Sequence, residues 1–368
     1  MGNTLLTAQR IADEAALQLE NNMVMANLVH RGYSTEFQKG RGSTIFIRNP
    51  GTFEAKDFSS TVDVQNITES SIAVILDKFK DISVEIGTKE LSLDIVDFSV
   101  QVLQPIMRAH AQQVDYDILN VVSAGIAGHT TVSGTPALSD LANLMGQLNL
   151  QKVPMQDRRV VLSAMTDAKY IALDALANAD KRGKSLTIDE AHIGRVLGAD
   201  FYMDQNVQTH TSGISDTAGA FKGAATAGAT AATVDALTDD EVVAAGDVFK
   251  VVGSDRGYLV VTGGTVDTNT VTITFTPALD AAVLDDAVVT FQDSHKMNLG
   301  FHRNAFALAS APLQPPMGGA TYGVATYKGI TCRTVMGYNM STKVNQLSVD
   351  ILYGVKLLNK ELAARLCD

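Results

Sequence analysis

The sequence has no tryptophan, and only 6% of its 368 residues are aromatic and 19% charged. Soluble domains usually carry about a quarter charged residues. No apolar run approaches the ~18 residues that a membrane-spanning helix needs, so no membrane span is predicted. Hydrophobic residues still make up 46%, enough for real cores, and the length favours two or more packed units. This composition fits a subunit whose surface is largely covered by neighbours.

Cysteine is equally scarce, since Cys332 and Cys367 are the only two and their spacing is not that of a metal site. Two isolated thiols fit a reducing compartment. The first residues lack the charged and apolar regions of a signal peptide. We therefore expect synthesis in a cytoplasm, without export by the general route. The formal net charge of −11 argues against a dedicated nucleic-acid binder, which usually carries a basic face.

Two short groups of basic residues remain, and no aromatic residues interleave with them. Solvated charge or salt bridges between subunits explains them better than DNA contact, because single-strand binding surfaces combine basic and aromatic side chains. The groups are Lys39, Arg41 and Arg48, and Lys152, Arg158 and Arg159.

Motifs for nucleotide hydrolysis occur only as fragments. A Gly-Lys-Ser triplet at 183–185 resembles the end of a phosphate-binding loop, and the letters DEAH at 189–192 resemble a helicase box. A phosphate loop needs glycine where Asn178 stands and should follow a strand, whereas this triplet follows a predicted helix. We therefore predict no nucleotide hydrolysis.

Metal and cofactor sites have no support either. The seven histidines never form a His-x-x-x-His pair, and no G-x-S-x-G or G-x-G-x-x-G motif occurs. His110, in a predicted helix, is expected on a polar face or at a cap, and His302 is expected to be a core histidine paired with backbone. The acidic turns at 239–241 and 285–286 lack the alternating spacing of a calcium loop. We expect no catalytic, cofactor-binding or metal-binding residues and no enzymatic activity.

Hydrophobic periodicity predicts an α+β protein. An amphipathic helix is expected at 4–21, and a long helix at 93–124 that begins or kinks at Pro105. Strands at 44–48, 71–76 and 81–86 predict a long ribbon. A ribbon with so little core of its own is more plausible lying across a neighbouring subunit. Further helices are expected at 137–150 and 164–179, and further strands at 159–163, 201–207, 298–309, 330–335 and 344–353.

The composition changes at residues 213–293, which are rich in Ala, Gly, Thr, Val and Asp. Short strands at near-regular spacing, separated by Gly, Asp and Asn turns, predict a small β barrel or sandwich. An apolar strand at 298–309 follows and fits the earlier α/β unit, so the module is predicted to be an insertion whose two ends lie close together. Its strands are expected at 231–235, 247–252, 258–262, 271–275 and 288–291.

The order of these elements resembles the tailed-bacteriophage major capsid protein, and more closely the coat proteins of short-tailed phages that carry an inserted β domain. Three stretches carry the resemblance: ANLVH at 26–30, RNPGTFEAKDF at 48–58 and, above all, NLGFHRNAFAL at 298–308. The resemblance runs essentially from end to end. One departure is the short turn at 252–257, where some relatives have a long loop that ties capsomers together.

The resemblance implies a domain map. The fold would be α+β, with an N-terminal arm, an extended β loop, a peripheral domain with a long spine helix, an axial α/β domain and an inserted all-β domain. The corresponding residues would be 1–40 for the arm, 41–90 for the loop, 91–135 and 330–368 for the peripheral domain, 136–211 and 294–329 for the axial domain, and 212–293 for the inserted domain.

The resemblance also implies partners. The chain would self-assemble as hexamers and pentamers into an icosahedral shell, with a scaffolding protein and a portal during assembly, in the host bacterial cytoplasm. The finished shell, the capsid of the virion, would hold double-stranded DNA without sequence specificity, and no membrane is involved. Because the loop and the arm would contact neighbouring subunits, the candidate interface residues are Arg48, Lys56, Asp57, Phe58, Leu5 and Ile11.

Other functions stay open at this point. An encapsulin-like nanocompartment shell with a protein cargo is the nearest alternative. The β module could also be a carbohydrate-binding or host-binding domain, although the absence of tryptophan weakens sugar stacking. Residues 219–293 hold 11 acidic and 3 basic residues, so the inserted module carries most of the net charge. If it faced outward, the shell would be acidic outside and nearly neutral elsewhere.

Overall fold

The structure is a computed structural model, and its chain divides into two compact units. Unit 1 comprises residues 1–22, 31–111 and 307–358, and unit 2 comprises residues 23–30, 112–306 and 359–368. The structure describes residues 8–32, 43–49, 55, 57, 64, 70–87, 99–123, 125–132, 135–178, 191–214, 218–316, 320–341 and 344–368.

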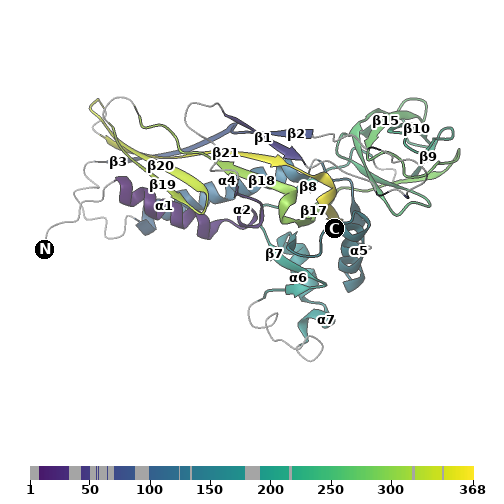
Figure 1. Cartoon of the computed structure of the whole chain (residues 1–368), viewed down its shortest axis with the longest axis horizontal. Coiled ribbons are helices and arrows are strands. Elements are labelled where there is room, and N and C mark those ends of the chain that lie inside the picture. Colours follow the sequence, from purple (N-terminus) through teal and green to yellow (C-terminus); the bar gives the residue numbers. More distant parts are fainter. Residues whose placement is uncertain are drawn as a thin grey trace. The chain divides into compact units, whose positions relative to one another are not determined.

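Unit 1 is built on a five-stranded sheet. Strands β18 (Phe306–Ser310), β21 (Val344–Leu357), β20 (Ile330–Asn339) and β19 (Thr321–Tyr327) follow in that order, and β3 (Lys78–Gly87) also pairs with β21. Helix α1 (Ala8–Asn22) lies along β19 and β20 (Figure 1). Its apolar stripe is buried as predicted. Glycine at position 323 allows this approach, because a Cβ there would come within 2.3 Å of the Ala8 carbonyl oxygen.

The predicted ribbon is shorter than expected. Strand β1 (Thr44–Asn49) pairs antiparallel with β2 (Ser70–Ile75) in a separate two-stranded sheet. The segment 81–86, predicted as part of the return arm, instead lies in β3 and pairs with β21 over ten residues. The physical reason is that β21 is long: β20 pairs along one edge, and the five-residue β18 leaves room for β3 along the other edge.

A long helix follows, and it begins where the proline predicts. A single π-helical stretch, Ser99–Leu103, leads into α4 (Gln104–Ser123), and Pro105 is the second residue of α4. Proline is tolerated there because the first turn of a helix has no partner for its amide. Within the described residues, no helix is long and apolar enough to cross a membrane.

Unit 2 contains a mixed seven-stranded sheet. Its order is β4 (His129–Thr131), β22 (Ala363–Cys367), β17 (His295–His302), β5 (Arg158–Leu162), β7 (Ala199–Met203) and β6 (Gly194–Val196), with β8 (Thr209–His210) also paired to β17. Helix α5 (Leu138–Leu150) packs against β22 and β4. The predicted helix at 164–179 is divided into α6 (Ala164–Ile171) and α7 (Asp174–Ala177). The short α2 (Met25–Leu28) also belongs to this unit.

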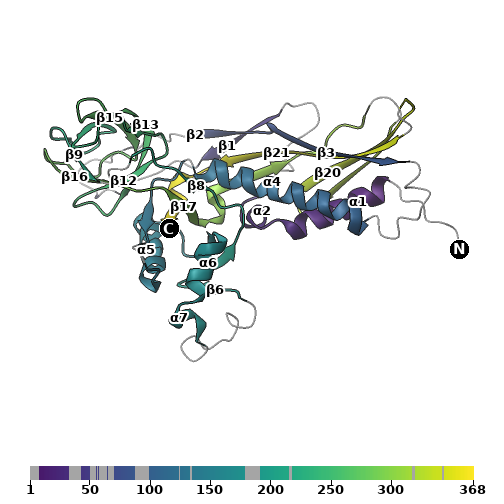
Figure 2. The same ribbon diagram turned by 180° about the vertical axis from the view of Figure 1, so that it is seen from behind.

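The inserted module is a closed six-stranded barrel. Its cyclic order is β10 (Ala231–Asp235), β15 (Val271–Thr276), β13 (Gly257–Thr262), β12 (Val248–Val251), β16 (Val288–Phe291) and β9 (Ala218–Phe221). Figure 2 shows these strands grouped together. Phe249 stacks on Tyr258 in the core, with ring centroids 5.4 Å apart. His210 and His295 are paired partners in β8 and β17, so the ends of the insertion lie side by side, as predicted.

Two boundaries differ from the predicted map. The apolar run 298–309, predicted as one strand, is divided into β17 and β18 by a 3₁₀ turn, Arg303–Ala305. His302 caps this turn, because its Nδ1 accepts the backbone amide of Asn304 at 3.2 Å. Residues 359–368 belong to unit 2, not with 330–358, because β22 pairs with β17. The assignment of arm, extended loop, peripheral domain and axial domain remains a prediction.

Candidate assembly interface

The ribbon β1–β2 has one buried and one exposed face. Ile47 and Val74 are 8% and 0% exposed and pack with Ala307 and Ala309 in unit 1. Strand alternation places Phe46 on the other face, where it is 67% exposed, and Ile75 is 48% exposed. Exposed apolar side chains on a narrow ribbon are suited to contact with another chain.

Most predicted interface residues cannot be placed. Leu5, Lys56 and Phe58 lie outside the described residues, and of Arg48 only the backbone is described, which pairs with Ser71 in the ribbon. Asp57 is exposed. Ile11 is 2% exposed and packs inside unit 1, which leaves its side chain little surface for a neighbouring subunit. The interface assignment therefore stays a prediction.

In the basic group Lys152, Arg158 and Arg159, the two arginines make hydrogen bonds inside unit 2. Arg158 is 5% exposed and donates to the carbonyls of Pro154 and Val153 at 2.8 and 2.6 Å. Arg159 donates to the carbonyl of Leu28. Burial lowers the pKa of both arginines. These contacts fix loops, so Arg158 offers little to DNA; Lys39 and Arg41 lie outside the described residues.

The fragments that resemble nucleotide-hydrolysis motifs cannot be compared with a site, because most of their residues are not described. Residues 183–185 and 189–190 are outside the described part of the chain. The acidic turns hold loops, since Asp285 accepts the amide of Gly223 at 2.7 Å and Asp239 accepts that of Asn269 at 2.5 Å. His110 is buried, and its Nε2 lies 3.0 Å from the carbonyl oxygen of Val349. Among the described residues, no group of three or more His, Cys, Asp or Glu could hold a metal ion.

A buried ionic cluster lies where the barrel joins the sheet of unit 2. Asp247, which is 1% exposed, accepts a hydrogen bond from Nε2 of His210 at 2.7 Å. Arg365, in β22, is fully buried and donates to the carbonyl of Gly246 at 3.3 Å. Burial lowers the pKa of Arg365 to about 10, and the Asp247 carboxylate opposes that shift. The cluster therefore joins the barrel to the last strand of the chain.

Two further histidines lie at this junction. Burial, together with the nearby charge of Arg365, lowers the pKa of His129 to about 3 and that of His295 to about 4. The Nδ1 atoms of both histidines lie within hydrogen-bond distance of backbone carbonyls, those of Ala127 and Asp293. Both rings are therefore neutral at pH 7.

A pair of buried carboxyl groups holds the N-terminal end of α2. Asp115 accepts the amides of Val24 and Ala26 at 2.7 and 2.9 Å. Burial, reinforced by the neighbouring Asp204, raises the pKa of Asp115 to about 7. Burial also raises the pKa of Asp204. These groups anchor residues 23–28 to unit 2.

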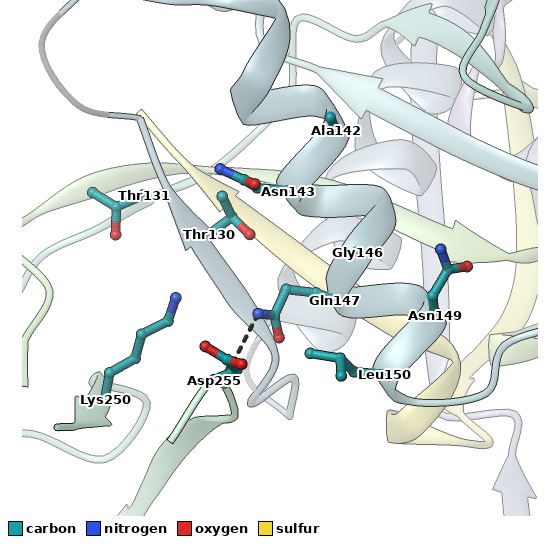
Figure 3. Close-up of a pocket in the computed structure, with 10 residues that line it drawn as sticks. All are labelled: Thr130, Thr131, Ala142, Asn143, Gly146, Gln147, Asn149, Leu150, Lys250 and Asp255. Atoms are coloured by element: carbon teal, nitrogen blue, oxygen red, sulfur yellow. Dashed lines mark hydrogen bonds between the residues drawn. The ribbon is translucent and has the colours of Figure 1, made fainter. Parts of the chain in front are cut away.

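A cleft of about 660 Å³ opens between α5 and the barrel (Figure 3). Gln147 closes one side, since its Nε2 donates to the carbonyl of Asp255 at 2.9 Å. Half of the ten lining residues are polar and uncharged, and the lining also contains one cation and one carboxylate. It comprises Thr130, Thr131, Ala142, Asn143, Gly146, Gln147, Asn149, Leu150, Lys250 and Asp255.

Comparison with known proteins gives no match in sequence: no family model and no curated protein matches the chain. Solved structures do match. A structure from Mycobacterium phage Che8 aligns over 94% of this chain and 90% of that chain, with 16% identity and a TM-score of 0.50. The chain has the phage capsid fold.

Two further structures match over most of the chain. The alignment with the capsid of Ralstonia phage GP4 covers 92% of this chain and 86% of the phage chain, at 11% identity and a TM-score of 0.49. A virus-like particle from Pyrococcus furiosus covers 97% of both chains, at 9% identity and a TM-score of 0.42.

Sequence reasoning missed two features of this capsid fold. Nothing in the sequence brings His129, Asp247 and Arg365 together, because they are distant in the chain. The cleft had a partial signal: glycine at position 146 interrupts an otherwise favourable predicted helix. Only the tertiary structure places Thr130 and Lys250 opposite that glycine.

Proposed function

We propose that this chain is the major capsid protein of a tailed phage and self-assembles into an icosahedral shell around double-stranded DNA. The capsid fold supports a shell subunit. The observation that carries the proposal further is the exposed apolar face of the β1–β2 ribbon, with Phe46 67% exposed. Burying such a face against a neighbouring copy would stabilise an assembly by roughly 25 cal/mol per Å² of apolar surface.

Assembly of this kind needs no catalytic site. Shell contacts are repeated by symmetry, so each interface can be modest while the closed shell is stable. We propose hexamers and pentamers of the chain as the building units, a scaffolding protein and a portal as assembly partners, and the host cytoplasm as the place of assembly. The protein acts as a structural component and not as an enzyme.

The charge distribution fits a container for nucleic acid. Residues 219–293 carry 11 of the 40 acidic residues but only 3 of the 29 basic residues. We propose that the barrel faces outward, which would leave the remainder of the subunit nearly neutral. A nearly neutral inner surface would repel packaged DNA only weakly.

Electron microscopy of purified particles, followed by nuclease treatment and extraction, tests the proposal. Icosahedral shells that protect double-stranded DNA are expected. Shells that hold a protein cargo and no DNA would instead favour the nanocompartment. A chain that stays monomeric with and without a scaffolding protein would rule out both.

A further inference from the structure

Helix α5 contains a glycine whose missing side chain leaves open space beside the helix. Gly146 lies in the interior of α5, where glycine is disfavoured relative to alanine. A Cβ at position 146 would meet no atom within 4 Å in the described part of the chain, so packing against those residues does not explain the missing side chain. With Ala142 one turn earlier, it forms a strip of small residues along the cleft. Such a strip allows another backbone to come close to the helix.

An independent observation in the same cleft concerns Thr130. This residue is 5% exposed and lines the cleft, yet its hydroxyl has no hydrogen-bond partner among the described residues. A buried hydroxyl without a partner costs free energy, so such groups are usually satisfied by protein or water. Figure 3 shows Thr130 between Asn143 and Lys250, on the wall facing α5. The wall of the cleft therefore holds a buried hydroxyl, unpaired among the described residues, next to the strip of small residues.

The cleft is also charged at two points. Lys250 projects into it from β12, and Asp255 lies at the barrel turn beside Gln147 (Figure 3). Leu150 adds an apolar rim and is 60% exposed. A complementary partner would be narrow, with a small residue at its tip, an apolar side chain, and one charge of each sign.

The β6–β7 hairpin of this chain has these properties. Its tight turn is formed by Leu197 and Gly198, both with positive φ, and Leu197 is 47% exposed. Arg195 and Asp200 are register partners in the two strands, so opposite charges lie on one face of the hairpin. The carboxylate can face Lys250 and the guanidinium can face Asp255.

The sheet order makes this pairing possible between copies. Strand β4, beside the cleft, is one edge of the seven-stranded sheet, and β6 is the opposite edge. A ring of identical subunits joins two different surfaces of the same chain, one on each flank. We propose that the cleft between α5 and the barrel receives the β6–β7 turn of a neighbouring copy. This inference rests on the proposed shell function and assigns its partner.

Disulfide trapping in assembled particles tests the contact. The double variant Ala142→Cys/Leu197→Cys should give a ladder of covalent multimers on denaturing gels after mild oxidation. The native thiols of Cys332 and Cys367 are buried and will not interfere. Each single variant should stay monomeric, and so should the control Ala142→Cys/Val261→Cys, whose second site is an equally accessible position on the barrel.

Other outcomes would overturn the contact. Intact particles of the double variant without multimers would refute it, and so would dimers from Ala142→Cys alone, which would mean that two clefts face each other. If the double variant does not assemble, the two single variants are co-assembled with wild-type subunits, and cross-linked dimers are still required. Failure of wild-type particles to form would instead refute the proposed function.

A blocking variant gives a second measurement. Gly146→Gln should leave the subunit folded, since glutamine favours helix, but its side chain would fill the cleft. Particle yield should fall by about tenfold or more, because the same contact is lost at every repeated interface. Unchanged particle yield with a folded subunit would contradict the proposal.

Discussion

Asp247 is the residue on which the junction between the barrel and the sheet depends. Its carboxylate is almost fully buried, accepts hydrogen bonds from His210 and from the amide of Ala244 at 2.7 Å each, and raises the pKa of the buried Arg365. Removing this carboxylate would leave two partly buried hydrogen-bond donors without their acceptor and the buried Arg365 without this opposite charge, which is far more costly than losing a surface interaction.

Asp247→Ala should therefore lower the free energy of unfolding by about 3–5 kcal/mol. Urea denaturation of the subunit, followed by circular dichroism, measures the change. The matched control is Asp293→Ala, an exposed aspartate close to the same junction, which should change stability by about 0.5 kcal/mol or less. Equal effects of the two substitutions would show that the cluster is not a stabilising junction.

The histidines of the junction predict acid sensitivity. His129 and His295 have pKa values of about 3 and about 4 in the folded subunit, below the usual value of 6.5. The unfolded chain therefore takes up protons first as pH falls. Their contribution to stability is complete above pH 6.5 and is lost between pH 6.5 and about 4, by about 1.4 kcal/mol per pH unit for each histidine.

Urea midpoints measured from pH 7.5 to 4 test this slope. In His295→Gln the free energy of unfolding should fall less steeply with falling pH than in the wild type, because one histidine fewer takes up a proton on unfolding. This difference in slope does not depend on the stability of the variant at pH 7. Asp115 acts in the opposite direction, because its raised pKa favours the folded state at lower pH. An identical slope in variant and wild type would contradict the assignment to His295.

At the scale of elements, the ribbon predicts a separation between folding and assembly. Phe46 lies on the exposed face of β1, so Phe46→Asp should change the stability of the subunit by about 0.5 kcal/mol or less but abolish particle formation. Leu284→Asp is the control, because Leu284 is equally exposed but lies on the barrel. Thermal unfolding and negative-stain microscopy measure the two effects. Normal particles from Phe46→Asp would exclude the ribbon face from assembly.

The elements also show which patterns were informative. Helix α1, the start of α4 at Pro105 and the barrel strands follow from periodicity and turn residues, which act locally. The pairing of β3 with β21 could not be predicted, because an alternating strand fits any free sheet edge. The division of 298–309 into two strands could not be predicted either. Strands that are buried on both faces consist mostly of apolar residues, so the boundary between β17 and β18 does not interrupt the apolar run.

At the scale of the whole molecule, the barrel shares a buried apolar cluster with the rest of unit 2. Val248 and Leu259 of the barrel form one buried cluster with Ala127 and Cys367 of the sheet region. Replacing residues 213–293 by a short Gly-Ser link would expose this apolar surface and leave Arg365 without its carboxylate. We expect a large loss of soluble, folded subunit or of control over shell size. Normal yield of normal shells would mean that the barrel is only decoration.

The sequence alone determined the α+β class, the main helices and a spliced-in β module, because these depend on residues a few positions apart. Its resemblance to phage capsid proteins also led to the prediction of a shell subunit. Only the tertiary structure decided that His129, Asp247 and Arg365 form one buried cluster and that Gly146 and Thr130 line one cleft. The physical reason is that sheet pairing and burial join residues more than a hundred positions apart, and no local pattern records such contacts.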